Sequence, residues 1–388
     1  MRKTKLLRIT TVPMSLNILL TNQMRFMEKK GFEVLAVSSK GPEIDKIVKR
    51  EGVRYFTVPF SRKISPITDF YCLLKLIFLI LKKKPDMVHT HTPKAGLIGM
   101  LASKICGVKY RFHTVAGLPF MTSKGLKRKL LILIEKLTYW SSNYVLPNSE
   151  SMRGVILEYK LVDTNKIKII GFGSSNGIDL DEFNPQALKS KITNKILNKI
   201  NHSKDKKYLL FVGRVVKDKG VTELVDAFIN LEKRFENYTL LIVGPIENIR
   251  KEEGIPLHIL DEIENNPRIM ALGWSDDVKY YLDIADFLIH PSYREGFPNV
   301  LLQAGAMGCP IICSDIPGNI DMVEHKITGL LFKSEDTRDL QNKLEFAFHN
   351  RDKMIIYANN FLDIVKKKFN RETVQQELYN FYIQKLNE

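Results

Sequence analysis

The stretch ADFLIHPSYREGFPNVLLQAGAMG, from Ala285 to Gly308, decides the fold of this chain. Its first part, FLIHPSY, is an apolar run typical of a buried parallel strand, and VLLQAGAM has helical spacing. The segment REGFPN between them has the glycine and proline of a tight turn. We therefore predict a strand, a short loop and a helix whose unpaired N-terminal N–H groups can bind an acceptor-rich ligand.

Glu295 lies at the mouth of this loop, where a carboxylate can accept hydrogen bonds from sugar hydroxyls. An ordinary strand-loop-helix crossover with a solvated glutamate is the alternative. This stretch alone leaves both interpretations open.

The length and composition indicate a globular protein with two domains. A chain of 388 residues exceeds the usual size of one hydrophobic core. The four cysteines form no CxxC pair and lie in apolar or helical stretches, which is typical of buried thiols in a reducing compartment. The N-terminus has too short an apolar run for a signal peptide and reads as a first strand, so we expect a cytoplasmic protein.

The net charge of +16 favours a partner that carries phosphate. Nucleotides, nucleic acids and anionic lipids all qualify. The sequence contains no helix-turn-helix, RNP motif or zinc finger, so nucleic acid is not expected.

Short apolar segments alternate with helical segments in both halves, which predicts α/β domains with parallel sheets. A loop rich in Gly, Ser, Asn and Asp, residues 171–185, separates the halves. The strands expected in the first half are Lys5–Thr11, Glu33–Ser39, Val53–Pro59, Met87–Thr92, Tyr110–Val115, Tyr144–Ser149 and Lys166–Gly173. Those expected in the second half are Tyr208–Arg214, Thr239–Pro245, Ile269–Trp274, Phe287–Tyr293, Pro310–Asp315 and Gly329–Lys333.

Two helical segments of the first half raise the question of a membrane surface. Phe70–Leu81 is too short to cross a bilayer and reads as a buried crossover helix or as a helix that partly faces a membrane. Ser123–Trp140 is amphipathic with basic residues near its start, and either covers the core or binds anionic lipid. Those basic residues are Lys124, Lys127, Arg128 and Lys129.

Histidines mark the ends of two strands in the first half. His89 and His91 project to one side of the fourth strand, but no third ligand stands at a metal-binding spacing, so no metal site is expected. His113 is expected at the carboxyl edge of the fifth strand, where ligands bind in open α/β sheets. A histidine that closes a strand can also be structural.

A basic loop follows the first strand of the second half. Gly213, Arg214, Lys219 and Gly220 stand between a strand and a helix. An arginine fork and a lysine from one loop can bind a diphosphate and neutralise a departing nucleoside diphosphate. A surface basic loop is the alternative.

Eight motifs, taken in order, resemble the retaining GT4-like glycosyltransferases of the GT-B fold. The sequences of the first two motifs, HTPKAG and FHTVAG, are most similar to those of the bacterial branch that builds capsule and O-antigen polysaccharides. The motifs are HTPKAG, FHTVAG, PNSE, NGIDL, GRVVKDKG, LGW, PSYREGFPN and ICSDIPG.

The resemblance implies two Rossmann-like, doubly wound parallel-sheet domains that face a cleft and close over it. The first is an acceptor-binding domain over residues 1–180. The second is a donor-binding domain over residues 181–364. A C-terminal helix over about 365–388 is expected to return to the first domain.

The resemblance also implies roles for residues. His113, Glu295, Arg214 and Lys219 would be catalytic, with the main-chain amides of 296–299 holding donor oxygens. The donor site would comprise Gly213, Arg214, Lys219, Gly244, Glu295, Gly296, Phe297, Pro298, Asn299, Val300 and Gln303; the acceptor side or cleft would comprise His91, Lys94, Thr114 and Gly117.

The chain departs from the family pattern at two places. Gln303 stands where the family has a second glutamate, so hydroxyl recognition can survive while the charge does not. The first loop reads Val-Pro-Met-Ser-Leu where many members have a Gly-Gly pair.

The implied reaction moves a sugar, an N-acetylated or deoxy hexose, from a UDP-sugar to a polyprenyl-diphosphate-linked saccharide. No cofactor and no metal are expected, because no DxD motif follows a strand. The enzyme would be peripheral on the cytoplasmic face of the inner membrane, at an anionic membrane surface. The alternatives are a GT-B UDP-sugar epimerase and an inactive module that binds nucleotide or lipid.

Overall fold

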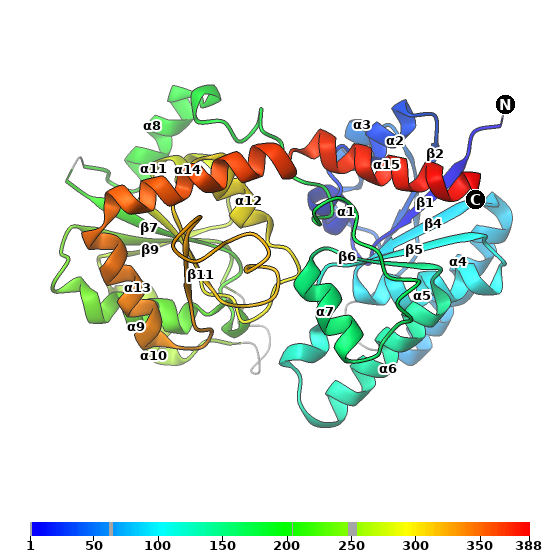
Figure 1. Ribbon diagram of the computed structural model, residues 1–388, viewed down its shortest axis with the longest axis horizontal. Helices are drawn as coiled ribbons and strands as arrows, with labels where there is room; N and C mark the ends of the chain where they lie inside the picture. The colour runs from blue at the N-terminus through cyan, green and yellow to red at the C-terminus, as the bar shows by residue number, and fades with distance from the viewer. Residues whose placement is uncertain (1, 62–64, 204, 247–253) are drawn as a thin grey trace. The chain divides into compact units, whose positions relative to one another are not determined.

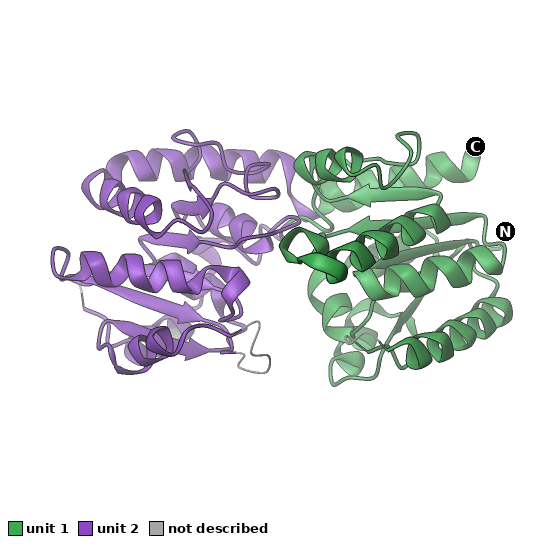
Figure 2. Ribbon diagram, turned by 90° about the horizontal axis from the view of Figure 1, so that it is seen from below, with its two compact units in different colours: residues 1–177, 372–388 green, residues 178–371 purple. Residues whose placement is uncertain are grey.

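The chain folds into two compact units. The computed structural model describes residues 2–61, 65–203, 205–246 and 254–388. Unit 1 comprises residues 1–177 and 372–388, and unit 2 comprises residues 178–371 (Figure 2). Each unit is an α/β layer structure around its own parallel sheet (Figure 1).

The sheet of unit 1 has six parallel strands in the order β3-β2-β1-β4-β5-β6. This doubly wound order confirms the predicted fold class. The strands are β1 (Lys5–Ile9), β2 (Glu33–Ser38), β3 (Arg54–Thr57), β4 (Met87–His91), β5 (Tyr110–Val115) and β6 (Tyr144–Pro147).

The seventh strand predicted for this sheet, over Lys166–Gly173, is wrong. Only one bridge forms there, between Val145 of β6 and Ile167. Gly171 and Gly173 then adopt positive φ angles and turn the chain away from the edge of the sheet.

Helices cover both faces of this sheet. Helices α1 to α3 and α15 share one core with one face, and α4 to α7 pack on the other. Their bounds are α1 (Pro13–Leu19), α2 (Gln23–Lys29), α3 (Ile44–Glu51), α4 (Pro66–Lys83), α5 (Pro93–Ile105), α6 (Gly125–Ser141), α7 (Glu150–Glu158) and α15 (Arg371–Asn387). The expected cap of α7 is confirmed, because Ser149 accepts a hydrogen bond from the Met152 N–H.

Helix α4 differs from the buried helix that its apolar sequence favours. Only Cys72, Leu76 and Ile80 are buried. The helix packs against α5 along this stripe, so the apolar residues on its other side remain exposed, and Phe78 is 68% exposed.

The strands of the unit 2 sheet have the order β12-β11-β10-β7-β8-β9. Read from β9 to β12, this is the same order as in unit 1. Every strand predicted in the second half is present, with shorter bounds. They are β7 (Lys207–Val212), β8 (Tyr238–Val243), β9 (Ile269–Gly273), β10 (Phe287–His290), β11 (Ile311–Ser314) and β12 (Leu330–Phe332).

The helices of unit 2 also form two layers. Helices α8, α11, α12 and α14 share a core with one face of the sheet, and α9, α10 and α13 with the other. Their bounds are α8 (Ser190–Lys199), α9 (Val221–Glu232), α10 (Leu257–Asn265), α11 (Val278–Ile284), α12 (Asn299–Ala306), α13 (Thr337–His349) and α14 (Arg351–Lys368).

The division between units differs slightly from the expected boundary. It falls after Gly177 rather than at residue 180, and residues 365–371 belong to unit 2. Phe369 explains the second difference, because its ring packs against Phe297 and its carbonyl accepts from the Ile178 N–H. Helix α15, red in Figure 1, then joins unit 1, where Leu378 and Tyr382 are buried in the core.

Candidate active site

Two loops of unit 2 begin at the point where the strand order reverses. Strands β7 and β10 are paired neighbours in the sheet, although β8 and β9 lie between them in the sequence. The loop after β7 contains Arg214 and Lys219, and the loop after β10 contains Glu295. Ligands of open α/β sheets bind at such a switch point, beyond the carboxyl ends of the strands.

Two glycines allow these loops to meet. Gly220 has a φ of +67°, and a Cβ on it would lie 2.0 Å from the Pro291 carbonyl oxygen. Gly244, after β8, has a φ of +147°, and its Cβ would lie 1.8 Å from the Gly213 carbonyl oxygen. No other residue fits either position, so both glycines set the spacing of the loops.

Lys219 and Glu295 form an ion pair across these loops. Lys219 Nζ lies 2.5 Å from Glu295 Oε1, and His290 Nε2 lies 3.2 Å from the same oxygen. The His290 contact has the distance of an ion pair but not the angles of a hydrogen bond. Among the described residues, no group bonds to Glu295 Oε2, so this oxygen can accept from a ligand.

The ionised form of Glu295 is strongly favoured. Burial of the side chain alone would raise its pKa, but Lys219 and His290 outweigh burial and hold the pKa below its usual range. Glu295 is therefore a hydrogen-bond acceptor, not a proton donor, at neutral pH.

The sequence did not single out Asp218, which holds the two loops together. Its carboxylate binds Arg294 at 2.8 Å, and its carbonyl accepts from the Tyr293 N–H at 2.9 Å. Tyr293 in turn donates its hydroxyl to Glu223 at 2.6 Å. The sequence could have indicated Asp218 as a functional residue, because it is an acidic residue inside the basic segment KDKG.

The residues after Glu295 divide between core and surface. Gly296, Phe297 and Pro298 are buried, and the Phe297 ring packs 5.2 Å from that of Phe369, so it anchors the loop in the core. Helix α12 begins at Asn299 without a side-chain cap. Asn299, Val300 and Gln303 are half-buried, and Asn299 and Gln303 share a face of α12 because they are four residues apart.

His113 does not have its expected position at the carboxyl edge of unit 1. Strand β5 continues to Val115, and the His113 ring is 2% exposed with Nδ1 2.8 Å from Thr90 Oγ1. A Cβ on Gly96 would lie 2.4 Å from this ring. Burial lowers the pKa of His113 to about 4, so the ring is neutral and enclosed against α5.

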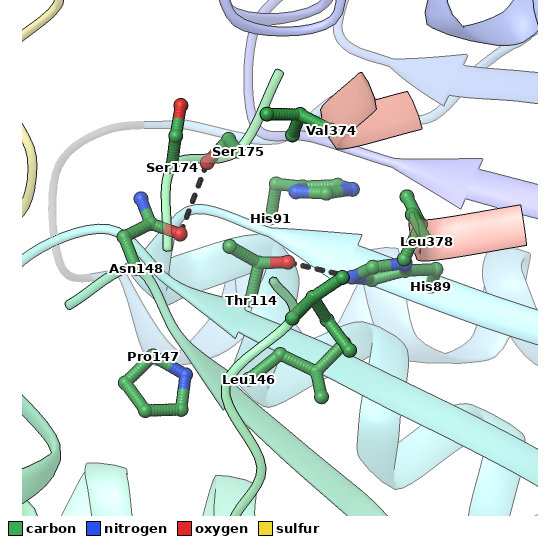
Figure 3. Close-up of a pocket in the computed structure, with 11 residues that line it drawn as sticks. His89, His91, Thr114, Leu146, Pro147, Asn148, Ser174, Ser175, Val374 and Leu378 are labelled. Carbon is green, nitrogen blue, oxygen red and sulfur yellow. Dashed lines mark hydrogen bonds between the residues drawn. The ribbon is translucent and has the colours of Figure 1, made fainter. Parts of the chain in front are cut away.

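His91 and Thr114 lie on the opposite face of the same sheet. Both line a small cavity together with Asn148, Ser174 and Ser175 (Figure 3). The structure therefore brings His91 and Thr114 together but separates them from His113.

The other residues expected at the acceptor side have separate positions. Lys94, at the start of α5, pairs with Asp69 of α4 at 2.8 Å. Gly117 is half-buried in the segment after β5.

Two further properties bear on the expected chemistry. Within the described ranges, no group of three His, Cys, Asp or Glu side chains is placed to hold a metal ion. None of the helices in this part of the chain is long and apolar enough to cross a bilayer.

Two family models match the chain, one for each half. The model described as Glycosyltransferase Family 4 matches residues 17–182, and the model described as Glycosyl transferases group 1 matches residues 192–361.

The relatives include enzymes of surface polysaccharide synthesis. The capsular polysaccharide biosynthesis glycosyltransferase CapM of Staphylococcus aureus is 33% identical, over 98% of this chain and 97% of its own length. The UDP-Gal:alpha-D-GlcNAc-diphosphoundecaprenol alpha-1,3-galactosyltransferase of Escherichia coli is 29% identical, over 83% of this chain and 81% of its own.

Solved structures share the fold. Anabaena HepE, in complex with UDP and glucose, has a TM-score of 0.82 at 16% identity, over 98% of this chain and 100% of that chain.

Proposed function

Because the chain belongs to the family 4 and group 1 glycosyltransferases, we propose that it transfers a sugar from a UDP-sugar to a saccharide on a polyprenyl diphosphate. The E. coli relative is named for UDP-galactose and for a diphosphoundecaprenol-linked acceptor, which supports both substrate classes. The S. aureus relative is named for capsule synthesis, which supports a role in surface polysaccharide. The transferred sugar in this proposal is an N-acetylated or deoxy hexose.

The Lys219–Glu295 pair at the switch point of unit 2 carries this proposal. Lys219 is the point charge that a diphosphate needs, and Glu295 has one carboxylate oxygen that no described residue bonds and that is available to donor hydroxyls. Arg214 lies in the same loop as Lys219 and is half-buried. Together these residues supply a cationic and an acceptor group within one loop pair.

The proposed reaction breaks the bond between the anomeric carbon and the diphosphate oxygen. The acceptor hydroxyl oxygen bonds to that carbon with retention of configuration, its proton passes to the departing diphosphate oxygen, and UDP leaves with the electron pair of the broken bond. Lys219 and Arg214 stabilise the charge that develops on the diphosphate. The amides of 296–299 hold donor oxygens, and Gln303 binds the ribose. His113 has no part in this proposal because its ring is enclosed in unit 1.

A transfer assay tests the function directly. Purified protein is incubated with a panel of UDP-sugars and a short-chain polyprenyl-diphosphate-linked saccharide, and the product and UDP release are measured. We expect transfer from at least one UDP-sugar. Nucleotide binding without transfer or hydrolysis would favour the inactive module instead.

We further propose that the reaction needs no metal ion, because Lys219 and Arg214 provide the positive charge. Activity is expected to persist in EDTA. Loss on chelation with recovery on added Mg²⁺ or Mn²⁺ would contradict this part of the proposal.

An anionic membrane surface is the proposed location, and two helices support it. Helices α4 and α6 both pack against α5 and expose apolar side chains. Phe78 of α4 and Leu126 of α6 are 68% and 83% exposed. The other exposed apolar residues of these helices are Ile67, Phe70, Tyr71, Leu74, Leu81, Leu130, Leu133, Leu137 and Trp140.

Basic residues flank this apolar surface, as anionic headgroups require. Lys124, Lys127 and Lys129 are exposed near the start of α6. Arg128 differs from expectation, because it binds the Tyr159 hydroxyl at 2.6 Å and is half-buried. Arg128 is therefore less exposed to a lipid headgroup than the three lysines.

Vesicle partitioning tests the membrane proposal. Replacing Lys124, Lys127 and Lys129 with Gln should weaken binding to phosphatidylglycerol vesicles by about 1 kcal/mol per residue. The matched control replaces Lys366, Lys367 and Lys368, three lysines at the end of α14 in unit 2. Equal partitioning of both triple variants at low salt would contradict the proposal.

A further inference from the structure

Arg8 is a fully buried cation in the middle of β1. Its exposed fraction is 0%, and Nη1 lies 2.8 Å from His89 Nδ1 and 3.0 Å from His91 Nε2. Among the described residues, Nε and Nη2 have no hydrogen-bond partner, and the Tyr382 ring lies 5.6 Å from the guanidinium carbon. No carboxylate of the described residues pairs with this guanidinium.

An arrangement of this kind is unfavourable in an empty protein. A buried charge without a counter-charge loses its hydration and gains no compensating attraction. The surrounding histidines are neutral and supply no counter-charge, since an imidazole is never anionic and burial and nearby positive charge hold the pKa of His89 and of His91 well below the usual range. A negative charge from outside the chain would compensate Arg8.

The contacts of Arg8 determine which nitrogen of each imidazole carries the proton. A guanidinium only donates hydrogen bonds, so His89 Nδ1 and His91 Nε2 are acceptors toward Arg8, and the Tyr382 hydroxyl also contacts His89 Nδ1. The proton of His89 is therefore on Nε2 and is donated to Thr114 Oγ1 at 2.7 Å. The proton of His91 is on Nδ1.

His91 and Asn148 both line the cavity shown in Figure 3. They are 3% and 5% exposed. Asn148 Oδ1 accepts from Ser175 Oγ at 3.1 Å, which leaves the amide NH₂ group as a donor. Within the part of the chain that the structure describes, neither the His91 Nδ1–H nor this NH₂ group has an acceptor.

The size and lining of the cavity define its ligand. Its volume of about 20 Å³ holds one oxygen atom rather than a whole sugar ring. The remaining lining is His89, the hydroxyl groups of Thr114, Ser174 and Ser175, and apolar side chains, which are those of Leu146, Pro147, Ile170, Val374 and Leu378. Two free N–H donors and a cation behind them favour an anionic oxygen over a neutral hydroxyl.

We propose that this cavity of unit 1 binds one oxygen of a phosphate-class oxyanion through His91 and Asn148, with Arg8 as the counter-charge. The class includes a free phosphate or pyrophosphate and the diphosphate of a lipid-linked acceptor. Identification with the acceptor diphosphate rests on the proposed function. The oxyanion site itself does not.

Calorimetry with pyrophosphate tests the site in full-length protein. All variants carry Lys219→Met, so that the cationic loop of unit 2 does not contribute. Arg8→Met should weaken pyrophosphate binding at least tenfold. It should also leave the unfolding temperature of the empty protein unchanged or raised, because an unpaired buried charge is removed.

Arg111→Met is the matched control. Arg111 lies on β5 and donates to the carbonyls of Ser141 and Val108, so it is satisfied by main chain. This control is expected to lose stability and to keep its pyrophosphate affinity within twofold.

Asn148→Asp provides a second test if Arg8→Met does not fold. An aspartate can still accept from Ser175, but it replaces the free donor with a negative charge, so pyrophosphate binding should be lost. Pyrophosphate affinity within twofold of the parent in either folded variant would overturn the proposal.

Competition identifies the source of the oxyanion. The diphosphate-linked saccharide should displace pyrophosphate from the parent protein if it is the natural ligand. If inorganic phosphate competes and the lipid-linked saccharide does not, the oxyanion site stands and its assignment to the acceptor is overturned. No donor sugar is present in these measurements, so a protein without transfer activity can still pass them.

Discussion

Units 1 and 2 have the same strand order but differ in the charged side chains that they leave without a partner. In unit 2, Lys219 pairs with Glu295, Arg294 with Asp218 and Arg351 with Asp286. In unit 1, Arg50 pairs with the buried Glu51 and Lys94 with Asp69, but Arg8 and Glu135 are buried and no described residue of opposite charge pairs with either. The same fold therefore carries a balanced site in one unit and an unbalanced one in the other.

This difference shows that strand order locates a site but does not define its ligand. A balanced pair is stable without ligand, and Lys219 stays in position before a diphosphate arrives. An unbalanced charge is stabilised when a ligand of opposite charge binds. In the proposed mechanism the loop of Lys219 is thus preorganised for the donor, whereas the cavity of unit 1 would gain stability when it binds an oxyanion.

Removal of Lys219 should have the largest effect on activity. Lys219→Ala is expected to lower turnover at least about a hundredfold, since one lost donor to developing charge costs roughly 3 kcal/mol. Arg214→Ala should have an effect of similar size. Steady-state kinetics of UDP release provides the measurement.

Lys217→Ala is the matched control for charge, because Lys217 is exposed two residues earlier in the same turn. Its turnover should stay near that of the wild type. Folded Lys219→Ala protein with wild-type turnover would remove the diphosphate-binding loop from the mechanism.

Glu135 should make unit 1 less stable as the pH rises. Burial raises the pKa of Glu135 from 4.5 to about 7. The stabilisation is present below pH 4.5, where the folded and unfolded states both bind the proton, and is lost as the pH rises to about 7. The loss amounts to roughly 3 kcal/mol of unfolding free energy.

Urea unfolding of wild type and Glu135→Gln between pH 4.5 and 8 measures this effect. The variant should gain stability over the wild type as the pH rises. A difference between the two proteins that does not change with pH would show that Glu135 is not a buried, unpaired acid.

Gln303 should have a small effect, because it can bind ribose hydroxyls without a charge. Gln303→Glu is expected to change the transfer rate by less than tenfold, about 1.4 kcal/mol, with modestly tighter donor binding. Donor affinity and rate are measured side by side. A silent wild type with an active variant would show that the natural chain is an inactive module.

The sequence predicted that Lys219 and Glu295 follow strands of unit 2, and the structure has both residues in loops after strand ends. An apolar strand followed by a basic or a glycine-rich loop identifies Lys219 and Glu295 without knowledge of packing. Parallel strands then bring their carboxyl ends to one edge.

The site of unit 1 could not be predicted in this way. His91 and His113 both follow apolar runs, but side chains alternate between faces, and only the strand register puts His91 beside Thr114 and His113 beside Thr90. Arg8 lies in the apolar run KLLRIT. A charged residue inside a predicted buried strand could have indicated this site, but no prediction was based on it. The exposure of α4 could not be predicted from the sequence either, because apolar residues occur on all sides of the helix and do not indicate which side is covered.

The division of roles between the units is tested most directly by the affinity for UDP. Calorimetry compares the wild type with Lys219→Met and Arg8→Met under identical salt. The account predicts at least tenfold weaker UDP binding for Lys219→Met and binding within twofold of the wild type for Arg8→Met. Unchanged UDP affinity in Lys219→Met, with a large loss in Arg8→Met, would contradict the assignment of the nucleotide to unit 2.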